Sequence, residues 1–391
     1  MYPILTLKSG KEDNLYFKHP WIFSGALSGI PKDIEHGSLV HIADTKGNIL
    51  GTGTFSGTSM FAVRIFDFSK AKIDYNWIKN KIFYADSKRL IKGPGLTGYR
   101  VVFGETDMLP GLIIDRYMDV FVIQISTAGM NNLKDFVIKA IKELFSPKAI
   151  YERSDLPSRK DEGLEEFSGE LFGKVEEPVE FKEFGIPLYS YPITGQKTGY
   201  FLDQKDLRKE IQKYSSDKKI LNLFSYSGAS GIYAMKAGAK SVHNVDSSKP
   251  ALKMCEEHAK LNKIKASNFT IEQADIFKYF PLEDKPEYDM VILDPPALIK
   301  SKADTEAGKK AYHYLNRGAL RLIKNNGIFI TSSCSHFLTE EDFTFILRRV
   351  SIQTKVELSI IKIVRQSSDH PLSIYFPESS YLKTFIAIVK K

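Results

Sequence analysis

The chain from about residue 193 onward alternates short apolar segments with stretches of helical periodicity. The apolar segments are rich in β-branched residues, and the stretches between them have apolar residues at helical spacing. Strict alternation of strand and helix implies right-handed crossovers and a parallel sheet buried on both faces. The predicted strands are KILNLF, SVHNVD, NFTIEQAD, YDMVILD and GIFITSS, and the predicted helices cover 230–239, 249–263, 304–324 and 339–350. We therefore expect an α/β fold with a Rossmann-like sheet in this region.

Two further apolar segments, VELSIIKIV and LKTFIAIVK, follow the last predicted helix with no helix between them. Parallel neighbours need a long crossover connection, whereas antiparallel neighbours do not. This break in the alternation predicts that an antiparallel strand joins the edge of the sheet.

The first predicted strand of this sheet runs into a turn of small residues, which covers Asn222–Gly231. Ligands of open α/β sheets bind at the carboxyl ends of the strands, and small residues let the backbone pass close to them. The spacing is not G-x-G-x-x-G, which argues against a dinucleotide and hence against a dehydrogenase. Taken alone, this turn would be an ordinary strand-to-helix connection.

Aspartates stand at the ends of the next three predicted strands. Asp246 follows the glycine turn by about 20 residues, where a carboxylate accepts hydrogen bonds from ribose hydroxyls. Asp275 is placed to meet an adenine amino group, with Ile276 beside the ring, and the fourth strand ends in Asp294-Pro295-Pro296. One such aspartate is usually a helix cap. Three in register after one glycine turn indicate a nucleoside ligand, and the combination points to S-adenosylmethionine.

The fifth predicted strand ends in a cysteine, Cys334, within Ser332-Ser333-Cys334-Ser335. Methylation at carbon 5 of a pyrimidine needs a thiolate that adds to carbon 6 and makes carbon 5 nucleophilic. Cys334 is placed for this role, although a small buried thiol is the commoner fate of a cysteine. Cys255, the other cysteine, lies within a predicted helix and is expected to be buried and inert. Neither has metal-ligand spacing with histidines, so no metal is expected.

The residues after the Asp-Pro-Pro segment help to discriminate between target atoms. Enzymes that methylate an amino group of a base usually place an aromatic residue directly after this segment to stack on the base. Here Ala297 and Leu298 follow, which favours a carbon target over an exocyclic nitrogen.

The N-terminal part of the chain predicts two smaller structures. The first ~70 residues contain short strands separated by turn signals, typical of a small all-β domain. Its segment HPWIFSGAL carries the aromatic residues Trp21 and Phe23, which either contact a ligand or fill the core. Residues 76–191 alternate between helical patterns, at 76–91 and 133–145, and strands, which predicts a compact α+β module. We expect an acidic loop at 161–183.

Charge and composition fit a cytosolic protein and leave the binding of a nucleic acid open. The net charge is +8, and the stretch from 151 to 184 holds 11 acidic and five basic residues, which leaves the rest of the chain strongly basic. A basic surface fits a polyanionic partner as well as a merely solvated face. No secretory signal and no apolar stretch near the ~20 residues of a membrane span is present. We expect a cytoplasmic protein without a membrane partner.

Across nearly its whole length the sequence resembles the class I methyltransferases that form 5-methylcytosine in large-subunit ribosomal RNA. HPWIFSGAL and GSLVHIADTKGNILGTGTFS resemble that family's N-terminal PUA domain, an RNA-binding barrel. GETDMLPGLIIDRY and YERSDLPSRKDEGL are similar to its central β-β-α-β-β module, and GQKTGYFLDQKDLR to its most specific signature. LNLFSYSGASG, VDSS, LDPPALIK, SSCSH, DHP and PESSYLK then occur in the family's order. The resemblance implies domains at 1–70, 71–190 and 191–391.

The resemblance also implies roles for single residues. Phe201, Leu202 and Asp203 would help to close the donor site, and Lys197 and Arg208 would lie near the cofactor or RNA, with a solvated helix residue as the alternative for Arg208. The residues predicted to bind the cofactor are Phe201, Asp203, Asn222, Phe224, Ser225, Tyr226, Gly228, Asp246, Ser247, Asp275, Ile276, Asp294 and Pro295. The predicted catalytic residues are Cys334 and Asp294, and the predicted RNA-binding residues are Lys197, Arg208 and Trp21. The family usually has an aromatic where this chain has Leu298.

The sequence thus predicts an S-adenosylmethionine-dependent cytosine-5 methyltransferase of large-subunit ribosomal RNA. Two alternatives stay open, namely methylation of another base or of an amino group, and a non-catalytic RNA-binding assembly factor with a vestigial cofactor pocket. The oligomeric state is also open, with a homodimer as one alternative.

Overall fold

The computed structural model describes residues 2–90, 92–93 and 95–391. Residue 91, the last of the helix expected at 76–91, lies outside this description. The chain divides into two compact units. Unit 1 comprises Met1–Gly185, Ser190–Leu202 and Ser368–Ser379, and unit 2 comprises Ile186–Tyr189, Asp203–Ser367 and Ser380–Lys391. A segment from late in the sequence therefore belongs to the unit that is built mainly from the first 185 residues.

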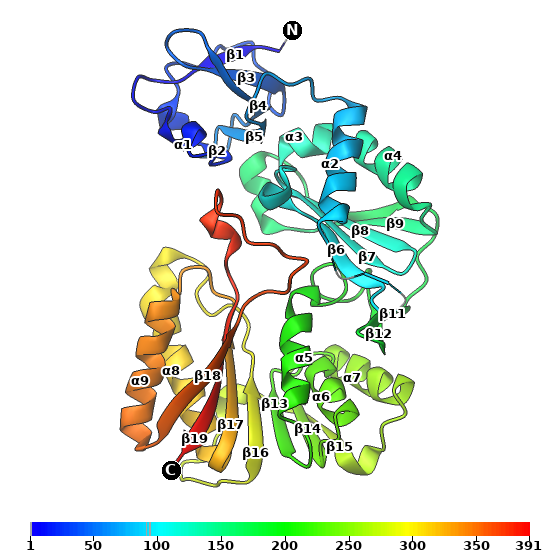
Figure 1. Ribbon diagram of the computed structural model, residues 1–391, viewed down its shortest axis with the longest axis vertical. Helices are drawn as coiled ribbons and strands as arrows, with labels where there is room; N and C mark the ends of the chain where they lie inside the picture. Colours follow the sequence, from blue (N-terminus) through cyan, green and yellow to red (C-terminus); the bar gives the residue numbers. More distant parts are fainter. Residues whose placement is uncertain (1, 91, 94) are drawn as a thin grey trace. The chain divides into compact units, whose positions relative to one another are not determined.

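The first part of unit 1 is a small curled sheet, in agreement with the all-β prediction (Figure 1). Its strands are in the order β1-β3-β4-β5-β2, with β1 parallel to β3 and the other pairs antiparallel. Alternating apolar residues such as Val40, Ile42 and Ile65 are fully buried inside it. Its elements are β1 (Ile4–Thr6), α1 (Asp13–Tyr16), β2 (Trp21–Ile22), β3 (Leu39–Ala43), β4 (Ile49–Phe55) and β5 (Val63–Asp67).

The second part of unit 1 is an α+β module in which helices pack on a five-stranded sheet (Figure 1). The strand order is β10-β9-β8-β7-β6, and only β8 and β9 pair in parallel. Helix α4 makes the crossover that this parallel pair requires, and its buried face, with Val137 and Ile141, packs on the sheet. The elements are α2 (Tyr75–Ser87), β6 (Gly98–Phe103), β7 (Leu112–Tyr117), β8 (Val120–Ile125), α3 (Ala128–Asn132), α4 (Lys134–Phe145), β9 (Ala149–Ser154), β10 (Phe167–Phe172) and β11 (Val179–Glu183).

The acidic loop expected at 161–183 is wrong in part, because two of the strands just named, β10 and β11, lie within it. Strand β10 pairs with β9 at the edge of the sheet, and its residues are all exposed or half-buried. An edge strand that is exposed on both faces needs no apolar alternation. For this reason hydrophobic periodicity does not predict β10, and the acidic composition of the stretch indicates a loop instead.

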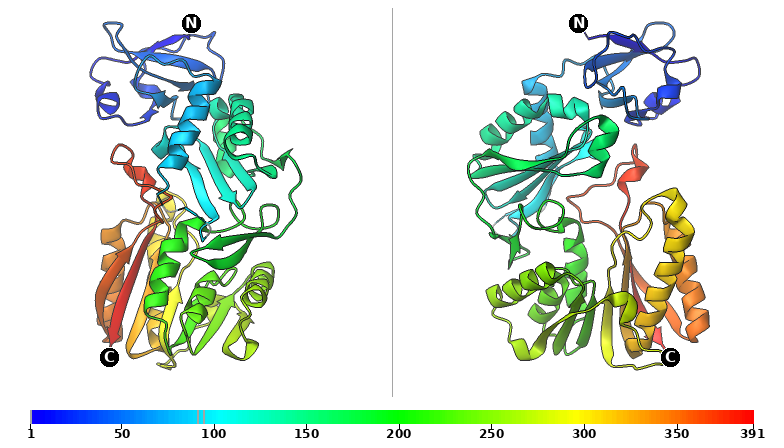
Figure 2. Two further views of the ribbon diagram at one scale, coloured as in Figure 1. Left: turned by 45° about the vertical axis from the view of Figure 1, so that its right-hand side comes forward. Right: turned by 180° about the vertical axis from the view of Figure 1, so that it is seen from behind.

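Unit 2 contains a seven-stranded sheet with helices on both faces, as the alternation predicted (Figures 1 and 2). Leu221, Leu223 and Leu293 join the core cluster that α8 and α9 cover, whereas Gly231 of α6 lies against Asn244 on the opposite face. The elements are β12 (Ile186–Ser190), α5 (Lys205–Lys213), β13 (Lys219–Leu223), α6 (Ala229–Lys236), β14 (Ser241–Asp246), α7 (Lys249–Leu261), β15 (Phe269–Gln273), β16 (Tyr288–Leu293), α8 (Thr305–Leu322), β17 (Ile323–Ser333), α9 (Glu340–Thr354), β18 (Glu357–Val364) and β19 (Lys383–Lys390).

The strand order of this sheet is β15-β14-β13-β16-β17-β19-β18. The pairs from β15 to β17 are parallel, and β19 is antiparallel to both of its neighbours. The antiparallel strand is therefore not at the edge, as the sequence suggested, but one place further in. Its residues from Lys383 to Ala387 are all buried, while β18 at the edge is mostly exposed. The apolar residues of β19 form one uninterrupted run, Phe385–Val389, whereas Lys362 interrupts those of β18, so β19 is the better suited to the inner position. No helix of the described residues is long and apolar enough to cross a membrane.

A buried ion pair in unit 1 gives a test of the α+β module. Arg89 and Asp107 are each 3% exposed, and both carboxylate oxygens of Asp107 accept from the guanidinium, at 3.0 and 2.6 Å. Replacing Asp107 with Ala leaves a buried cation without its partner and should lower the free energy of unfolding by about 3–5 kcal/mol in urea titrations. The matched control is Asp119→Ala, which removes an exposed carboxylate 3.8 Å from Arg116. Equal effects of the two variants would contradict this account.

Candidate functional site

The turn that follows β13 has an unusual backbone. Phe224, Tyr226 and Gly228 all have left-handed φ angles, of 56°, 46° and 70°. The Gly228 N–H donates to the Ser225 carbonyl at 2.8 Å and closes the turn. Residues other than glycine rarely adopt this region, so strained backbone of this kind is typical of ligand sites. The Ser225 hydroxyl is buried and has no hydrogen-bond partner among the described residues, which leaves a polar group in the turn for a ligand.

A buried histidine of α7 anchors the same turn. His258 Nδ1–H donates to the Ser227 carbonyl at 2.8 Å, while Nε2 accepts from the Tyr189 N–H at 2.8 Å. Burial lowers the pKa of His258, which keeps the ring neutral and able to make both bonds. The turn is therefore fixed in place by α7, the helix that connects β14 to β15.

Asp246, at the end of β14, is half-buried and faces this turn. Its carboxylate accepts from the Tyr226 N–H and from the Ser248 N–H, both at 2.9 Å. These bonds fix the carboxylate at the carboxyl edge of the sheet and leave further lone pairs for ribose hydroxyls. Ser247 beside it is exposed, and its carbonyl accepts from Gln273 at 3.1 Å.

Asp275 and Asp294 have different surroundings. Asp275 is exposed and caps a short helical turn by accepting from the Phe277 N–H at 3.0 Å, while Ile276 is buried in the core. Asp294 is half-buried and accepts from the Gln204 side chain at 2.9 Å. Asp275 is thus the helix cap that the sequence analysis named as the usual role of such an aspartate. Asp294 is less accessible and is followed by the buried Pro295.

Asn222 lies inside β13 rather than at its end. It is 2% exposed, and its side-chain amide donates to Asn244 at 2.9 Å. Asn244 in turn donates to the Thr270 carbonyl at 3.3 Å, so that side-chain amides link three adjacent strands. This placement gives Asn222 a part in holding the strands beneath the turn.

Aromatic side chains that the sequence analysis did not single out lie beside the turn. Phe277 follows Ile276 and meets the Phe224 ring at 6.3 Å between centroids, and it stacks on Tyr314 of α8 at 6.5 Å with a 7° interplanar angle. Phe277 and Tyr314 are 39% and 47% exposed. Exposed, mutually fixed aromatic rings at the carboxyl edge of a sheet are suited to contact a flat base. No periodic signal marks them, because one comes from a short helical turn and the other from a helix far away in the sequence.

Cys334 follows β17 and is half-buried. Its neighbours are fixed by hydrogen bonds from two other parts of the chain, α8 and the loop that follows β16. Tyr312 of α8 shares its hydroxyl with Ser333 at 3.0 Å and Ser335 at 2.9 Å, and the Ile299 N–H donates to Ser335 at 3.1 Å. The network holds the backbone on both sides of the thiol and leaves the thiol itself at the carboxyl edge of the sheet.

Cys255 is a structural residue. It is fully buried on α7, and burial raises its pKa far above the ordinary range. A Cβ added to Gly228 would lie 2.1 Å from its sulfur, so the thiol fills the space directly beneath the turn. A thiol that stays protonated cannot act as a nucleophile.

The remaining predicted residues fall in both units. In unit 1, Lys197 is exposed and places its ammonium 4.2 Å from the centre of the Phe201 ring. In unit 2, Asp203 is buried and accepts from the Tyr381 hydroxyl at 2.7 Å. Arg208 on α5 is only 3% exposed, which excludes a solvated helix residue.

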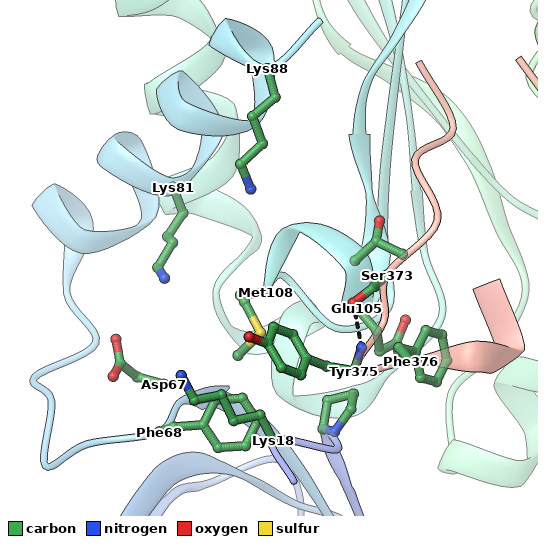
Figure 3. Close-up of a pocket in the computed structure, with 12 residues that line it drawn as sticks. Lys18, Asp67, Phe68, Lys81, Lys88, Glu105, Met108, Ser373, Tyr375 and Phe376 are labelled. Atoms are coloured by element: carbon green, nitrogen blue, oxygen red, sulfur yellow. Dashed lines mark hydrogen bonds between the residues drawn. The ribbon is translucent and has the colours of Figure 1, made fainter. Parts of the chain in front are cut away.

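An open pocket of about 350 Å³ lies within unit 1 (Figure 3), and Trp21 contacts two of the residues that line it. Its indole N–H donates to Glu105, a lining residue, at 3.1 Å, and its ring meets Phe376, another lining residue, at 4.7 Å. Lys18, Lys81 and Lys88 also line this pocket. Lys81 and Lys88 extend from α2 on one side of the pocket, and the Lys18 ammonium lies 5.6 Å from the centre of the Tyr375 ring (Figure 3).

Comparison with known proteins agrees with this geometry. Residues 5–68 match the PUA-like domain family, and residues 158–343 match the S-adenosylmethionine-dependent methyltransferases. A putative SAM-dependent methyltransferase from Streptococcus mutans superposes with a TM-score of 0.84 at 23% identity and covers 99% of this chain and 100% of its own. A structure described as SMU.776, a putative methyltransferase complexed with SAH, has the same scores and coverage. Fold and site together define an S-adenosylmethionine-dependent methyltransferase.

Curated relatives narrow this class further. Ribosomal RNA large subunit methyltransferase I of Aeromonas salmonicida is 37% identical over 99% of this chain and 99% of its own length. The protein of the same name from Shewanella denitrificans is 36% identical over 98% of this chain and 99% of its own. The chain belongs to the ribosomal RNA large subunit methyltransferase I family. Its cofactor is S-adenosylmethionine, and the left-handed turn, the unused Ser225 hydroxyl and the fixed Asp246 carboxylate fit such a ligand.

Gly228→Ala tests the turn. The new Cβ would strain a φ of 70° and meet the Cys255 sulfur at 2.1 Å. We expect a loss of about 2–4 kcal/mol in the free energy of unfolding and at least about tenfold weaker binding of S-adenosylmethionine in calorimetry. Adding Cys255→Ala removes the clash but not the backbone strain, so the double variant should regain part of the stability. A single variant that binds the cofactor normally would refute this role of the turn.

Proposed function

We propose that this protein methylates carbon 5 of a cytosine in large-subunit ribosomal RNA, with Cys334 as the nucleophile. The support is the position of Cys334 at the end of β17, one strand away from Asp294 at the end of β16, on the same edge of the sheet as the cofactor turn. Its full-length relatives are named as methyltransferases of large-subunit ribosomal RNA. Such RNA is in the cytoplasm, where we place the reaction.

The reaction divides between Cys334 and Asp294. The Cys334 thiolate adds to carbon 6 of the cytosine, and Asp294 contacts the edge of the pyrimidine, where its carboxylate accepts a hydrogen bond from the cytosine amino group. S-adenosylmethionine supplies an electrophilic methyl group, which carbon 5 then takes. A base removes the carbon-5 proton, the bond between sulfur and carbon 6 breaks, and Cys334 leaves as the thiolate. The target base must be unpaired or flipped out, because its ring atoms are inaccessible within a helix.

Cys334→Ala is the decisive variant. It should lower methyl transfer by more than about a thousandfold, because the activating adduct cannot form, while binding of S-adenosylmethionine stays near normal. The matched control, Cys255→Ala, removes the buried thiol and should keep its activity. The measurement is incorporation of labelled methyl groups into unmodified ribosomal RNA, followed by identification of the modified nucleoside by mass spectrometry. Full activity of Cys334→Ala would refute the mechanism, and a methylated nucleoside other than 5-methylcytosine would refute the target.

We propose in addition that the unit 1 pocket beside Trp21 contacts the RNA. Three lysines surround an opening that also holds Tyr375 and Phe376. Both carboxylates in the lining are partly engaged already, since Glu105 accepts from Trp21 at 3.1 Å and Asp67 accepts from an indole at 3.3 Å. Ammonium groups next to accessible rings suit an RNA phosphate with an unstacked base.

The double variant Lys81→Met/Lys88→Met tests this contact. If both lysines bind phosphates, the slope of log affinity for single-stranded RNA against log salt should become shallower by about 1.4, at roughly 0.7 per contact. Fluorescence anisotropy with a labelled oligonucleotide of the target region measures it. The matched control is Lys139→Met/Lys142→Met on α4, which also removes two lysines that lie 4.2 and 4.4 Å from aromatic ring centres. Equal slopes for both variants would refute a specific role of the pocket.

A further inference from the structure

Lys383, the first residue of β19, reaches the segment that holds Cys334. It pairs with Ser333, the last residue of β17. Its ammonium donates to the carbonyl of Ser335 at 2.8 Å and to the carbonyl of Leu338. These bonds hold the backbone directly after Cys334. The side chain belongs to the segment PESSYLK, which the proposed reaction does not otherwise use.

The environment of this ammonium is unusual, because the group is buried and its hydrogen-bond acceptors are uncharged backbone carbonyls. Lys383 is 6% exposed. Among the described residues no carboxylate oxygen lies within 4 Å of it, and its two hydrogen bonds leave the third N–H unused. A buried cation without an adjacent anion is costly, and a nearby anion offsets that cost.

The charges around Lys383 identify that anion. Burial lowers the pKa of Lys383 to about 8, and the charge of Cys334 is the largest influence that acts in the opposite direction. Glu340 and Asp342 of α9 also raise this pKa, and Arg365 after β18 lowers it. From α8, Tyr312 faces Cys334 as a neutral phenol, because burial and the Cys334 charge both raise its pKa. Below about pH 8 the ammonium is therefore the cation best placed to interact with a Cys334 thiolate.

We propose that Lys383 is a positioning residue that keeps the Cys334 sulfur in its thiolate form. The inference rests on the proposed role of Cys334 in methyl transfer. During the reaction the ammonium stabilises the thiolate before it attacks carbon 6, and again when the bond between sulfur and carbon 6 breaks. It remains protonated throughout and transfers no proton.

The pH dependence of thiol alkylation tests this without RNA or methyl transfer. The chain has two cysteines, and Cys255 is fully buried, so iodoacetamide reports on Cys334, as peptide mass spectrometry can verify. In Lys383→Met the midpoint of the rate profile should move up by about one pH unit or more, which slows alkylation near pH 7 by about tenfold. Lys383→Arg should keep most of the wild-type profile. The control Lys324→Met removes a half-exposed lysine from the same strand as Ser333 and should leave it unchanged.

Four outcomes decide between these possibilities. A folded Lys383→Met protein with the wild-type midpoint overturns the proposal. So does a wild-type midpoint at or above about pH 8.5, the value of an ordinary thiol, and this measurement needs no variant. If the midpoint shifts as expected, methyl transfer by Lys383→Met should be slow near pH 7 and recover as the pH is raised, with unchanged KM for RNA. A shifted midpoint together with full activity of Cys334→Ala would refute the proposed function alone and leave the pairing of Lys383 with Cys334 standing.

Discussion

The parallel pairing of β13, β14, β16 and β17 is the constraint on which the rest of unit 2 depends. Strands buried on both faces cannot slide or invert without exposing apolar side chains, so their carboxyl ends meet at one edge of the sheet. The Asp246 carboxylate, Asp294 and the Cys334 thiol come from three of these ends. The residues proposed to bind the cofactor and to act on the base thus lie where the strands end, rather than within the hydrogen-bonded ladder.

Sequence periodicity predicted this part of the molecule well, because local patterns determine it. The five parallel strands and the helices between them have apolar runs or helical spacing of their own. Asp246 and Cys334 could be placed at strand ends for the same reason. The structure adds what the pattern leaves open, namely that Asp275 caps a turn and that Asn222 is bonded within the sheet.

Other features depend on contacts between residues far apart in sequence, which no local pattern reports. Asp369 accepts from the Arg100 N–H at 2.8 Å, although 269 positions separate them. The segment that contains Asp369 therefore belongs to unit 1, whereas the strands that flank it in sequence belong to unit 2. The same limit applies to Lys383, whose relation to Cys334 follows only from the pairing of β17 with β19. The two cysteines show the same limit, because the chain buries Cys255 fully within a helix and leaves Cys334 half-buried at a strand end.

The inner position of β19 has a consequence for biosynthesis. A ribosome makes β17 and β18 before β19, yet in the finished sheet β19 lies between them. Until it emerges, β17 and β18 cannot occupy their final places, and each exposes a backbone edge that is open to mispairing. The loop after Cys334 also lacks its lysine anchor during this interval. The turn after β13 is thus made well before β19, and the Cys334 thiol gains its final surroundings only when the sheet is complete.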